Sequence, residues 1–291
     1  MKKKLHIAVQ KSGRLHDESL KLLNDCGISI DNGKDQLKAV ARHFPLEVYY
    51  LRNGDIPQYL RDGVVDVAII GENLLVEKGA EIVVKEKLGF SKCRVSIAIP
   101  KDDDYSGVQS LKGKKIATSY PNTVNQFLAE KGVDADLHII NGSVEIAPNI
   151  GLSDAVCDIV SSGSTLFKNN LKEVEVLFTS EAVLAASNTL DDDKSEILSK
   201  LRFRIQSVLK GRQSKYILMN VPNDSIEKIS SILPVLKSPT VLPLAEPGWS
   251  SLHSVINEGT FWEVIDQLKA AGAQDILVCP VEKVDDGVRC S

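Results

Sequence analysis

The chain has 291 residues, which is enough for two or three domains, and its hydrophobic content of 43% is sufficient for ordinary buried cores. Its formal net charge of -4 excludes a global positive field that would recruit nucleic acid, so an anion-binding site has to be local. The five cysteines are scattered and odd in number, which argues against a complete disulfide framework and favours a reducing compartment. The five histidines are isolated, without an H-x-x-x-H pattern, so transition-metal ligation is not expected.

The N-terminus begins with a basic tetrapeptide, but the apolar run after it is too short for the core of a signal peptide. No stretch approaches the length of a membrane span. We therefore expect a cytoplasmic protein with neither a membrane nor a nucleic acid as partner.

Residues 5–9 form the first predicted strand, and a helical pattern of leucines begins at Leu15. Lys11 and Arg14 flank a Ser-Gly turn between the two elements. On composition alone this pattern fits a solvated turn as well as an anion site, because Lys and Arg side chains are usually exposed.

The next predicted strands are residues 47–51 and 64–71. The second run is nearly continuous in apolar residues, as expected of a strand that is covered on both faces. Glu72 follows at its carboxyl end. Because ligands of open α/β sheets gather at such ends, Glu72 is a candidate site residue.

Residues 63–71 and 152–163 form a weak internal repeat, since each places an aspartate at a buried strand and a glycine five positions later. Two similar α/β lobes would explain the repeat, and chance similarity is the alternative. A strand at residues 93–100 is long enough to cross to a second lobe. A strand at residues 181–187 would return, and a helix from Ser195 to Lys210 would follow. This is the plan of periplasmic-binding-protein-like folds, whose lobes close on a ligand.

The most informative stretch runs from Ser143 to Leu171. A short apolar strand at residues 157–160 leads into a hydroxyl-rich turn, and a helical pattern begins at Leu166. The free amides and the dipole of a helix start favour an anion. The residues of this predicted phosphate loop are Ser161, Ser162, Gly163, Ser164 and Thr165.

Two carboxylates precede the phosphate loop. Asp158, at the end of the strand, could accept hydrogen bonds from sugar hydroxyls, and Asp154 lies four residues earlier. The alternative is an N-cap turn in which Ser162 or Ser164 only satisfies helix amides. The adjoining carboxylates favour the phosphate loop.

The last part of the chain is separable. Its predicted elements alternate as strand 215–220, helix 225–233, strand 240–244, strand 251–256, helix 260–271 and strand 275–281. The order βαββαβ is that of the ferredoxin-like unit, which by itself implies no function.

Residues 151–166, with Glu145 before them and Asn169 and Leu171 after them, resemble the signature of the ATP phosphoribosyltransferase family, which performs the first step of histidine biosynthesis. The sequence departs from that pattern at Ser162, where the family often has Thr, and at Ser164, where it often has Ala. Neither change removes a donor. The resemblance covers the whole chain, including a C-terminal domain found only in the long form of the family.

The resemblance implies an α/β fold with a two-lobe, periplasmic-binding-protein-like catalytic core and a C-terminal ferredoxin-like (βαββαβ, ACT-like) regulatory domain. Catalytic lobe I is expected at residues 1–92 and 185–212. Catalytic lobe II, which carries the phosphoribosyl-binding loop, is expected at residues 93–184, and the regulatory domain at residues 213–291.

The reaction implied by the family joins N1 of the adenine of ATP to C1 of phosphoribosyl pyrophosphate and releases pyrophosphate. Adenine N1 is already a nucleophile, so no Ser/His/Asp triad is needed and no general base is assigned. The polyphosphates require cations. The expected cofactor is Mg2+, held mainly through substrate phosphates, and its direct protein ligands are not assigned.

Site residues are carried over from the family signature and from the polar positions described above. The expected catalytic residues are Asp158, Asp154 and Arg14. The expected substrate-binding residues are Lys11, Arg14, Glu72, Arg94, Glu145, Asp158, Ser161, Ser162, Gly163, Ser164 and Thr165.

The long-form family uses its C-terminal domain to bind histidine as a feedback inhibitor, and residues 238–244 match its ligand segment. The match implies Ser238 and Thr240 as histidine contacts, together with Asn220, which stands where a relative has an acidic residue. From the residues alone, Ser238 and Thr240 would be interpreted as the start of a strand after Pro239. Long-form relatives form dimers and hexamers, so a homo-oligomer is expected.

Two other classes of protein remain open. One is a cytosolic ligand-binding sensor on the two-lobe fold, and the other is a ferredoxin-like interaction module attached to a catalytically dead core. Asp158 with the phosphate loop, and Lys11 with Arg14, favour the transferase, since an amino-acid binder has little use for two polyphosphate anchors.

Overall fold

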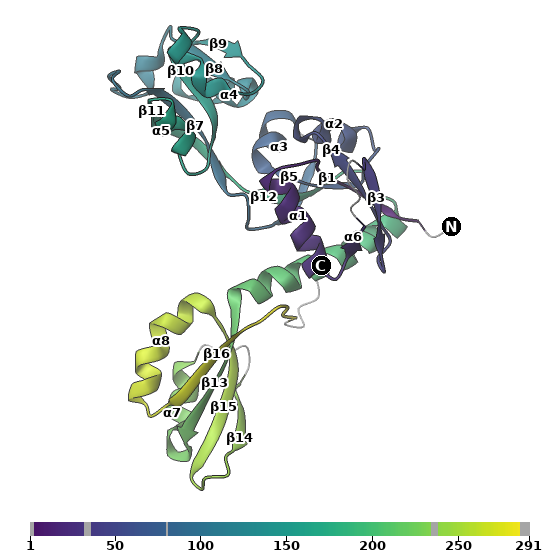
Figure 1. Ribbon diagram of the computed structural model, residues 1–291, viewed down its shortest axis with the longest axis vertical. Helices are drawn as coiled ribbons and strands as arrows, with labels where there is room; N and C mark the ends of the chain where they lie inside the picture. Colours follow the sequence, from purple (N-terminus) through teal and green to yellow (C-terminus); the bar gives the residue numbers. More distant parts are fainter. Residues whose placement is uncertain (1–2, 32–35, 80, 234–237, 286–291) are drawn as a thin grey trace. The chain divides into compact units, whose positions relative to one another are not determined.

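The computed structural model describes residues 3–31, 36–79, 81–233 and 238–285. Its strands form three sheets, of seven, five and four strands (Figure 1). By its internal contacts the chain divides into two compact units, Met1–Lys21 with Ile28–Ile197, and Leu22–Gly27 with Leu198–Ser291. The first two sheets belong to the first unit and are called lobe I and lobe II below. The third is called the C-terminal sheet.

Lobe I is built on the sheet β2-β3-β4-β1-β5-β12-β6. The bounds are β1 (Leu5–Gln10), β2 (Ser29–Ile30), β3 (Lys38–Arg42), β4 (Leu46–Leu51), β5 (Val67–Gly71), β6 (Val83–Lys87) and β12 (Ala182–Ala186). The central strand β1 runs parallel to β4 and β5. Val67 to Ile70 of β5 are fully buried, which confirms a strand covered on both faces. The predicted start at residue 64 is three residues too early, since Val64 is exposed and precedes the strand.

Three helices accompany this sheet: α1 (Arg14–Asp25), α2 (Ile56–Arg61) and α3 (Glu72–Lys78), with the 3-10 turn η1 (Asn53–Asp55) before α2. Pro57 lies in the first turn of α2, where its missing N–H leaves no helix hydrogen bond unmade. Ile56 and Leu60 of α2 and Leu74 of α3 pack in one core cluster with β5. These contacts fix the loops that follow β4 and β5.

Lobe II is built on the sheet β11-β7-β10-β8-β9. The bounds are β7 (Cys93–Pro100), β8 (Lys115–Thr118), β9 (Asp136–Ile139), β10 (Ala155–Val160) and β11 (Leu171–Ser180). Its helices and 3-10 turns are η2 (Val108–Leu111), α4 (Pro121–Lys131), η3 (Val144–Ile146), η4 (Pro148–Ile150) and α5 (Ser164–Lys168). The strand β10 pairs antiparallel with β7 and parallel with β8, so it lies inside the sheet.

The chain leaves lobe I after β6 and returns at β12. Both passages lie side by side, because the Leu88 amide donates to the Ala182 carbonyl and the Ala182 amide donates to the Phe90 carbonyl, each at 2.9 Å. The double crossing is as predicted, but the predicted role of residues 93–100 as a crossing strand is wrong. That strand, β7, lies wholly within the sheet of lobe II, where β11 and β10 flank it.

A polar joint connects α3 of lobe I to the start of α4 in lobe II. The buried Glu77 carboxylate accepts hydrogen bonds from the amides of Asn122 (3.0 Å) and Thr123 (2.9 Å) and from the Thr123 hydroxyl (2.8 Å). A carboxylate is favourable at that position because the first amides of a helix lack partners within the helix. Nearby, Asn73 Nδ2 donates to the hydroxyl of the buried Tyr120 at 2.8 Å.

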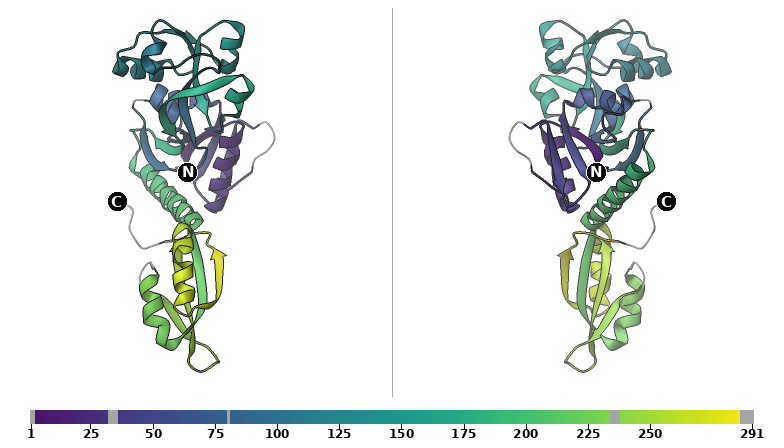
Figure 2. Two further views of the ribbon diagram at one scale, coloured as in Figure 1. Left: turned by 90° about the vertical axis from the view of Figure 1, so that its left-hand side faces the viewer. Right: turned by 90° about the vertical axis from the view of Figure 1, so that its right-hand side faces the viewer.

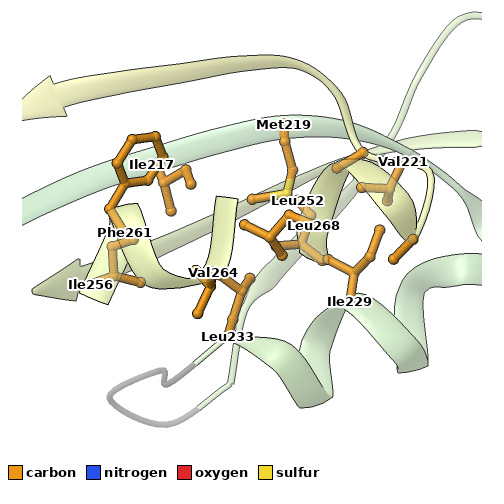
Figure 3. Packing of buried hydrophobic residues seen from close by; sticks show 12 residues of the cluster. Ile217, Met219, Val221, Ile229, Leu233, Leu252, Ile256, Phe261, Val264 and Leu268 are labelled. Atoms are coloured by element: carbon orange, nitrogen blue, oxygen red, sulfur yellow. The ribbon is translucent and has the colours of Figure 1, made fainter. Parts of the chain in front are cut away.

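The C-terminal sheet has the order β14-β15-β13-β16. The elements in sequence are β13 (Ser214–Pro222), η5 (Asn223–Ser225), α7 (Ile226–Ile232), β14 (Thr240–Pro243), β15 (Trp249–Asn257), α8 (Glu258–Ala270) and β16 (Gln274–Pro280). This confirms the predicted βαββαβ order. Figure 3 shows Ile217 and Met219 of β13 pointing toward Val264 and Leu268 of α8, in one core cluster.

Helix α6 (Asp192–Gln213) is longer at both ends than predicted and is continuous (Figure 2). From Leu198 onward it belongs to the second compact unit, where Arg204 donates to the Cys26 carbonyl at 3.1 Å. The segment after β16 crosses it at Gly211, where an added Cβ would lie 2.5 Å from the backbone of Glu282. This position therefore requires glycine.

Candidate functional site

The predicted phosphate loop follows β10, which ends at Val160. Gly163 has φ 76°, in the left-handed region that glycine adopts at little cost, and it turns the chain into α5. The Ser162 hydroxyl donates to that of Ser164 at 3.0 Å. The predicted helix beginning at Leu166 is in fact five residues long, Ser164–Lys168, because β11 starts at Leu171. Loop amides and hydroxyls rather than a long helix are therefore the donors here.

Asp158 lies on β10 three residues before the loop, and its carboxylate accepts the Ile159 amide at 2.8 Å. Burial raises its pKa from 3.8 to about 6, and the negative charge of Glu145 adds to the rise. The structure thus brings Glu145, on η3, into electrostatic range of Asp158. Asp158 is opposite Ser96 of β7 in the register, so their side chains share a face of the sheet.

The structure does not bring Asp154 to the same place. Asp154 precedes β10, and its carboxylate accepts the Lys115 amide at 2.8 Å at the start of the parallel strand β8. Four residues of strand separate it from Asp158, about 13 Å at the usual rise. Its placement fits a structural contact at the opposite edge of the sheet, so the predicted catalytic role gains no support.

Arg94, on β7, is engaged in lobe II. Its Nε and Nη2 atoms donate to the two oxygens of Glu173, each at 2.5 Å, and its Nη1 donates to the Ser161 carbonyl at 3.1 Å. The predicted phosphate-binding cation is therefore next to the loop, but it is held by a carboxylate that the sequence did not single out.

In lobe I the expected residues lie at the carboxyl edge of the parallel strands. Lys11 follows β1, and its amide donates to the Leu51 carbonyl of β4 at 2.7 Å. Glu72 is the first residue of α3 after β5, and Lys87 Nζ lies 3.6 Å from its carboxylate. Arg14 begins α1 with an exposed side chain whose Nε lies 3.5 Å from Glu18. The two lobes thus hold separate parts of the predicted set.

Arg52 is a further candidate at this edge that the sequence pattern did not indicate. It directly follows β4, whose end is bonded to Lys11, and it is exposed. The rule that selected Glu72, a polar residue at the carboxyl end of a parallel strand, selects Arg52 as well. With Lys11 and Arg14 it makes three cations at this edge of lobe I.

The C-terminal residues expected to contact histidine lie at the C-terminal sheet. Thr240 is opposite His253 of β15, and Asn220 is opposite Ser251, so both share the sheet face away from the buried Met219. Ser238 is exposed just before β14. Asn220 Nδ2 donates to Asp275 at 3.0 Å. A carboxylate is therefore next to Asn220, which stands where a relative has an acidic residue.

In the part of the chain that the structure describes, no helix is long and apolar enough to cross a membrane. Among the same residues, no three His, Cys, Asp or Glu side chains gather into a group that could hold a metal ion. A cation with many oxygen ligands would need most of them from a substrate.

The fold and these placements define a class: a two-lobed α/β protein of the periplasmic-binding-protein type, with a separate ferredoxin-like unit after it. A family model described as ATP phosphoribosyltransferase matches residues 52–207. A second, described as HisG, C-terminal domain, matches residues 211–283. The chain belongs to the ATP phosphoribosyltransferase family of histidine biosynthesis, in its long form, and is an enzyme of that family.

Known relatives agree over nearly the whole length. The ATP phosphoribosyltransferase of Cytophaga hutchinsonii is 55% identical over 280 residues, 96% of this chain and 98% of the relative. That of Parabacteroides distasonis is 52% identical and covers 96% and 99%. A solved ATP phosphoribosyl transferase complex from Thermotoga maritima is similar with a TM-score of 0.62 and 27% identity, covering 71% of this chain and 98% of that chain. The predicted family is confirmed, and the sensor and interaction-module alternatives lose their support.

Proposed function

We propose that this enzyme transfers the phosphoribosyl group of phosphoribosyl pyrophosphate to N1 of the adenine of ATP, releasing pyrophosphate, and that histidine inhibits it. The observation that carries the proposal is the partly buried carboxylate of Asp158 next to a loop of four hydroxyl residues and a left-handed glycine. A phosphorylated sugar needs this combination, an acceptor for its hydroxyls and neutral donors for its phosphate.

In this proposal the loop from Ser161 to Thr165 binds the 5-phosphate, and Asp158 accepts hydrogen bonds from the ribose hydroxyls. With a pKa of about 6, Asp158 is charged at neutral pH and can accept them. Glu145 keeps further negative charge nearby, which stabilises positive charge that develops at C1 as the pyrophosphate leaves. Both substrates are held in line, and positioning supplies much of the rate because adenine N1 needs no activation.

Lys11, Arg14 and Arg52 are the proposed anchors for the polyphosphate groups, at the edge of lobe I where Lys11 is bonded to the end of β4. Glu72 begins α3 at the same edge and is the proposed partner for a substrate hydroxyl or amine. Mg2+ is the proposed cofactor. It would be held mainly by substrate phosphates and would neutralise the charge of the pyrophosphate.

Histidine is the proposed inhibitor, bound at the C-terminal sheet by Ser238 and Thr240. Asp275, held by Asn220, is the proposed acceptor for its ammonium group, since a carboxylate pairs with an ammonium more strongly than an amide does. We further propose a homo-oligomer, a dimer or a hexamer, which a mass measurement in solution tests directly.

Pyrophosphate release from ATP and phosphoribosyl pyrophosphate with Mg2+ tests the proposal, with and without histidine. The expected result is release that histidine suppresses and that Asp158→Ala largely abolishes. The matched control is Asp102→Ala, an exposed carboxylate in the turn after β7. A folded wild-type oligomer that releases no pyrophosphate would overturn the proposed reaction.

A further inference from the structure

Arg94 and Glu173 form a bidentate ion pair beside the phosphate loop. Two guanidinium nitrogens bond the two carboxylate oxygens at 2.5 Å each, and both side chains are mostly buried, with 32% and 24% exposed. The third nitrogen, Nη1, donates to the carbonyl of Ser161 at 3.1 Å. Arginine presents its donors in a rigid planar fork, so fixing two of them also fixes the direction of the third.

The strands bring these groups together from three parts of the chain. In β7, Arg94 is opposite Val160 of β10 on one side and Thr179 of β11 on the other. Glu173 comes from the first part of β11, next to a break in the register with β7. Arg94 and Ser96 are two residues apart on β7, so their side chains point to the same face of the sheet, which is also the face of Asp158. The Arg94 side chain therefore lies on the same side of the sheet as the proposed sugar acceptor.

The contact with Ser161 sets the direction of the next amide. A peptide unit is planar and trans, so its carbonyl and its N–H point to opposite sides. When Arg94 holds the Ser161 carbonyl, the N–H of Ser162 is turned to the other side, as one of the first donors of the loop. The Arg94 hydrogen bonds also lower the pKa of Glu173, which keeps the pair charged at neutral pH.

We propose that Glu173 is a positioning residue: through Arg94 it fixes the Ser161 peptide, and thereby the donors of the loop that binds the phosphoribosyl 5-phosphate. This inference rests on the proposed function. It makes Arg94 part of the framework of the loop, rather than a free cation for the substrate. The competing arrangement is that Arg94 binds substrate phosphate directly and that Glu173 only occupies it beforehand.

The substitution Glu173→Gln separates the two arrangements because they predict opposite changes. A positioning role predicts that KM for phosphoribosyl pyrophosphate rises about tenfold, while kcat and KM for ATP stay within about twofold, since loop donors bind ground state and transition state alike. If Arg94 binds substrate phosphate and Glu173 only competes for it, the substitution frees Arg94 and lowers KM for phosphoribosyl pyrophosphate. That result would overturn the proposal. The matched control is Asp31→Asn, which removes the same charge from the exposed pair with Arg42.

Substitution of Arg94 adds a second comparison. Lysine keeps the charge but not the fork, so Arg94→Lys and Arg94→Met are expected to raise KM for phosphoribosyl pyrophosphate equally. Retention of most of the affinity by Arg94→Lys alone would contradict the positioning role, because only a charge acting on the substrate survives that change.

Binding of inorganic phosphate to the ligand-free protein, followed by backbone amide NMR signals, tests the positioning role without any reaction. The Ser162 and Gly163 signals should respond to phosphate at about tenfold higher concentration in Glu173→Gln than in the wild type, while the signal of Lys115 at the start of β8 should not respond in either protein. Equal phosphate affinity in the two proteins would refute the positioning role even if the enzyme is active. An inactive wild type that binds phosphate more tightly than the variant would refute the proposed function alone.

Discussion

Asp158 is held in a setting that disfavours its own charge. Its pKa in the folded protein is about 6 against an ordinary 3.8, so the folded state binds the proton more tightly than the unfolded chain does. The resulting loss of stability is absent below pH 3.8 and is fully present above pH 6. Such a penalty is typical of a residue kept for chemistry.

We therefore expect Asp158→Asn to raise the free energy of unfolding by up to roughly 3 kcal/mol at pH 8 and to change it little at pH 4. The same variant should lose most of its activity. Urea denaturation at both pH values measures the first effect, and pyrophosphate release measures the second. A variant that is less stable than the wild type at pH 8 would show that the carboxylate contributes to the fold instead.

Asp154 is expected to behave in the opposite way. Its carboxylate accepts the Lys115 amide, so Asp154→Ala should lower the free energy of unfolding by about 1 kcal/mol and leave both KM values nearly unchanged. Asp154→Asn retains an acceptor oxygen and should restore most of the stability. A large fall in kcat for Asp154→Asn would reinstate the catalytic role expected from the sequence.

The candidate site residues differ in whether they are close together in the sequence or only in the folded chain. The loop from Ser161 to Thr165 could be predicted as a candidate phosphate site because its donors and its glycine are consecutive. The pairing of Arg94 with Glu173 could not, because 79 residues separate them and the pair exists only once β7 and β11 are neighbours. The catalytic role of Asp154 stays a prediction. Its spacing of four residues from Asp158 could be read from the sequence, but its contact with the Lys115 amide exists only once β8 and β10 are neighbours.

Among the elements, the joint between α3 and α4 depends on one side chain. Glu77→Gln keeps the size of the residue but replaces one acceptor oxygen by a donor that faces backbone N–H groups. We expect a loss of about 2 kcal/mol in the free energy of unfolding. We also expect faster hydrogen exchange at the amides of Asn122 and Thr123, because both donate hydrogen bonds to the Glu77 carboxylate in the wild type.

The control for this joint is Glu130→Gln near the other end of α4, an exposed residue that Gln126 contacts at 3.1 Å. It should change neither stability nor exchange at the start of the helix. If the Asn122 amide exchanges equally fast in Glu77→Gln and in the wild type, the Glu77 carboxylate does not stabilise the first turn of α4.

Strongly patterned elements were predictable, and weakly patterned ones were not. The buried runs β5 and β10 and the βαββαβ order of the last third follow from apolar patterns and turn residues. The short strands β2 and β3 were missed, because β2 has only two residues and β3, Lys38–Arg42, alternates only two buried alanines with exposed residues. The crossing assigned to residues 93–100 failed because a sequence shows that a strand is long, but not which sheet it joins.

At the scale of the whole molecule, the C-terminal sheet should change the response to histidine without changing the basal reaction. We expect Thr240→Ala and Asp275→Asn each to raise the histidine concentration for half inhibition about tenfold, because each removes one charged or polar contact. Activity without histidine should stay within about twofold of the wild type. Assays of pyrophosphate release over a histidine series measure both quantities.

The matched control for this series is Asp266→Asn on α8, the helix packed against the other face of the C-terminal sheet. It should leave the inhibition curve where it is. If Asp275→Asn is inhibited like the wild type, the ammonium acceptor is not Asp275, and Asn220 acts without it.

The side-by-side passages at Leu88 and Ala182 give lobe II the form of a cassette set into one loop of lobe I. Recombination between relatives could therefore exchange residues 91–181 with both junctions already adjacent, as in a domain insertion. The exchange would still affect stability, because Glu77 remains in lobe I while its hydrogen-bond donors, Asn122 and Thr123, belong to the exchanged segment. Chimeras between distant relatives should thus be most stable when the glutamate and the start of α4 come from the same parent.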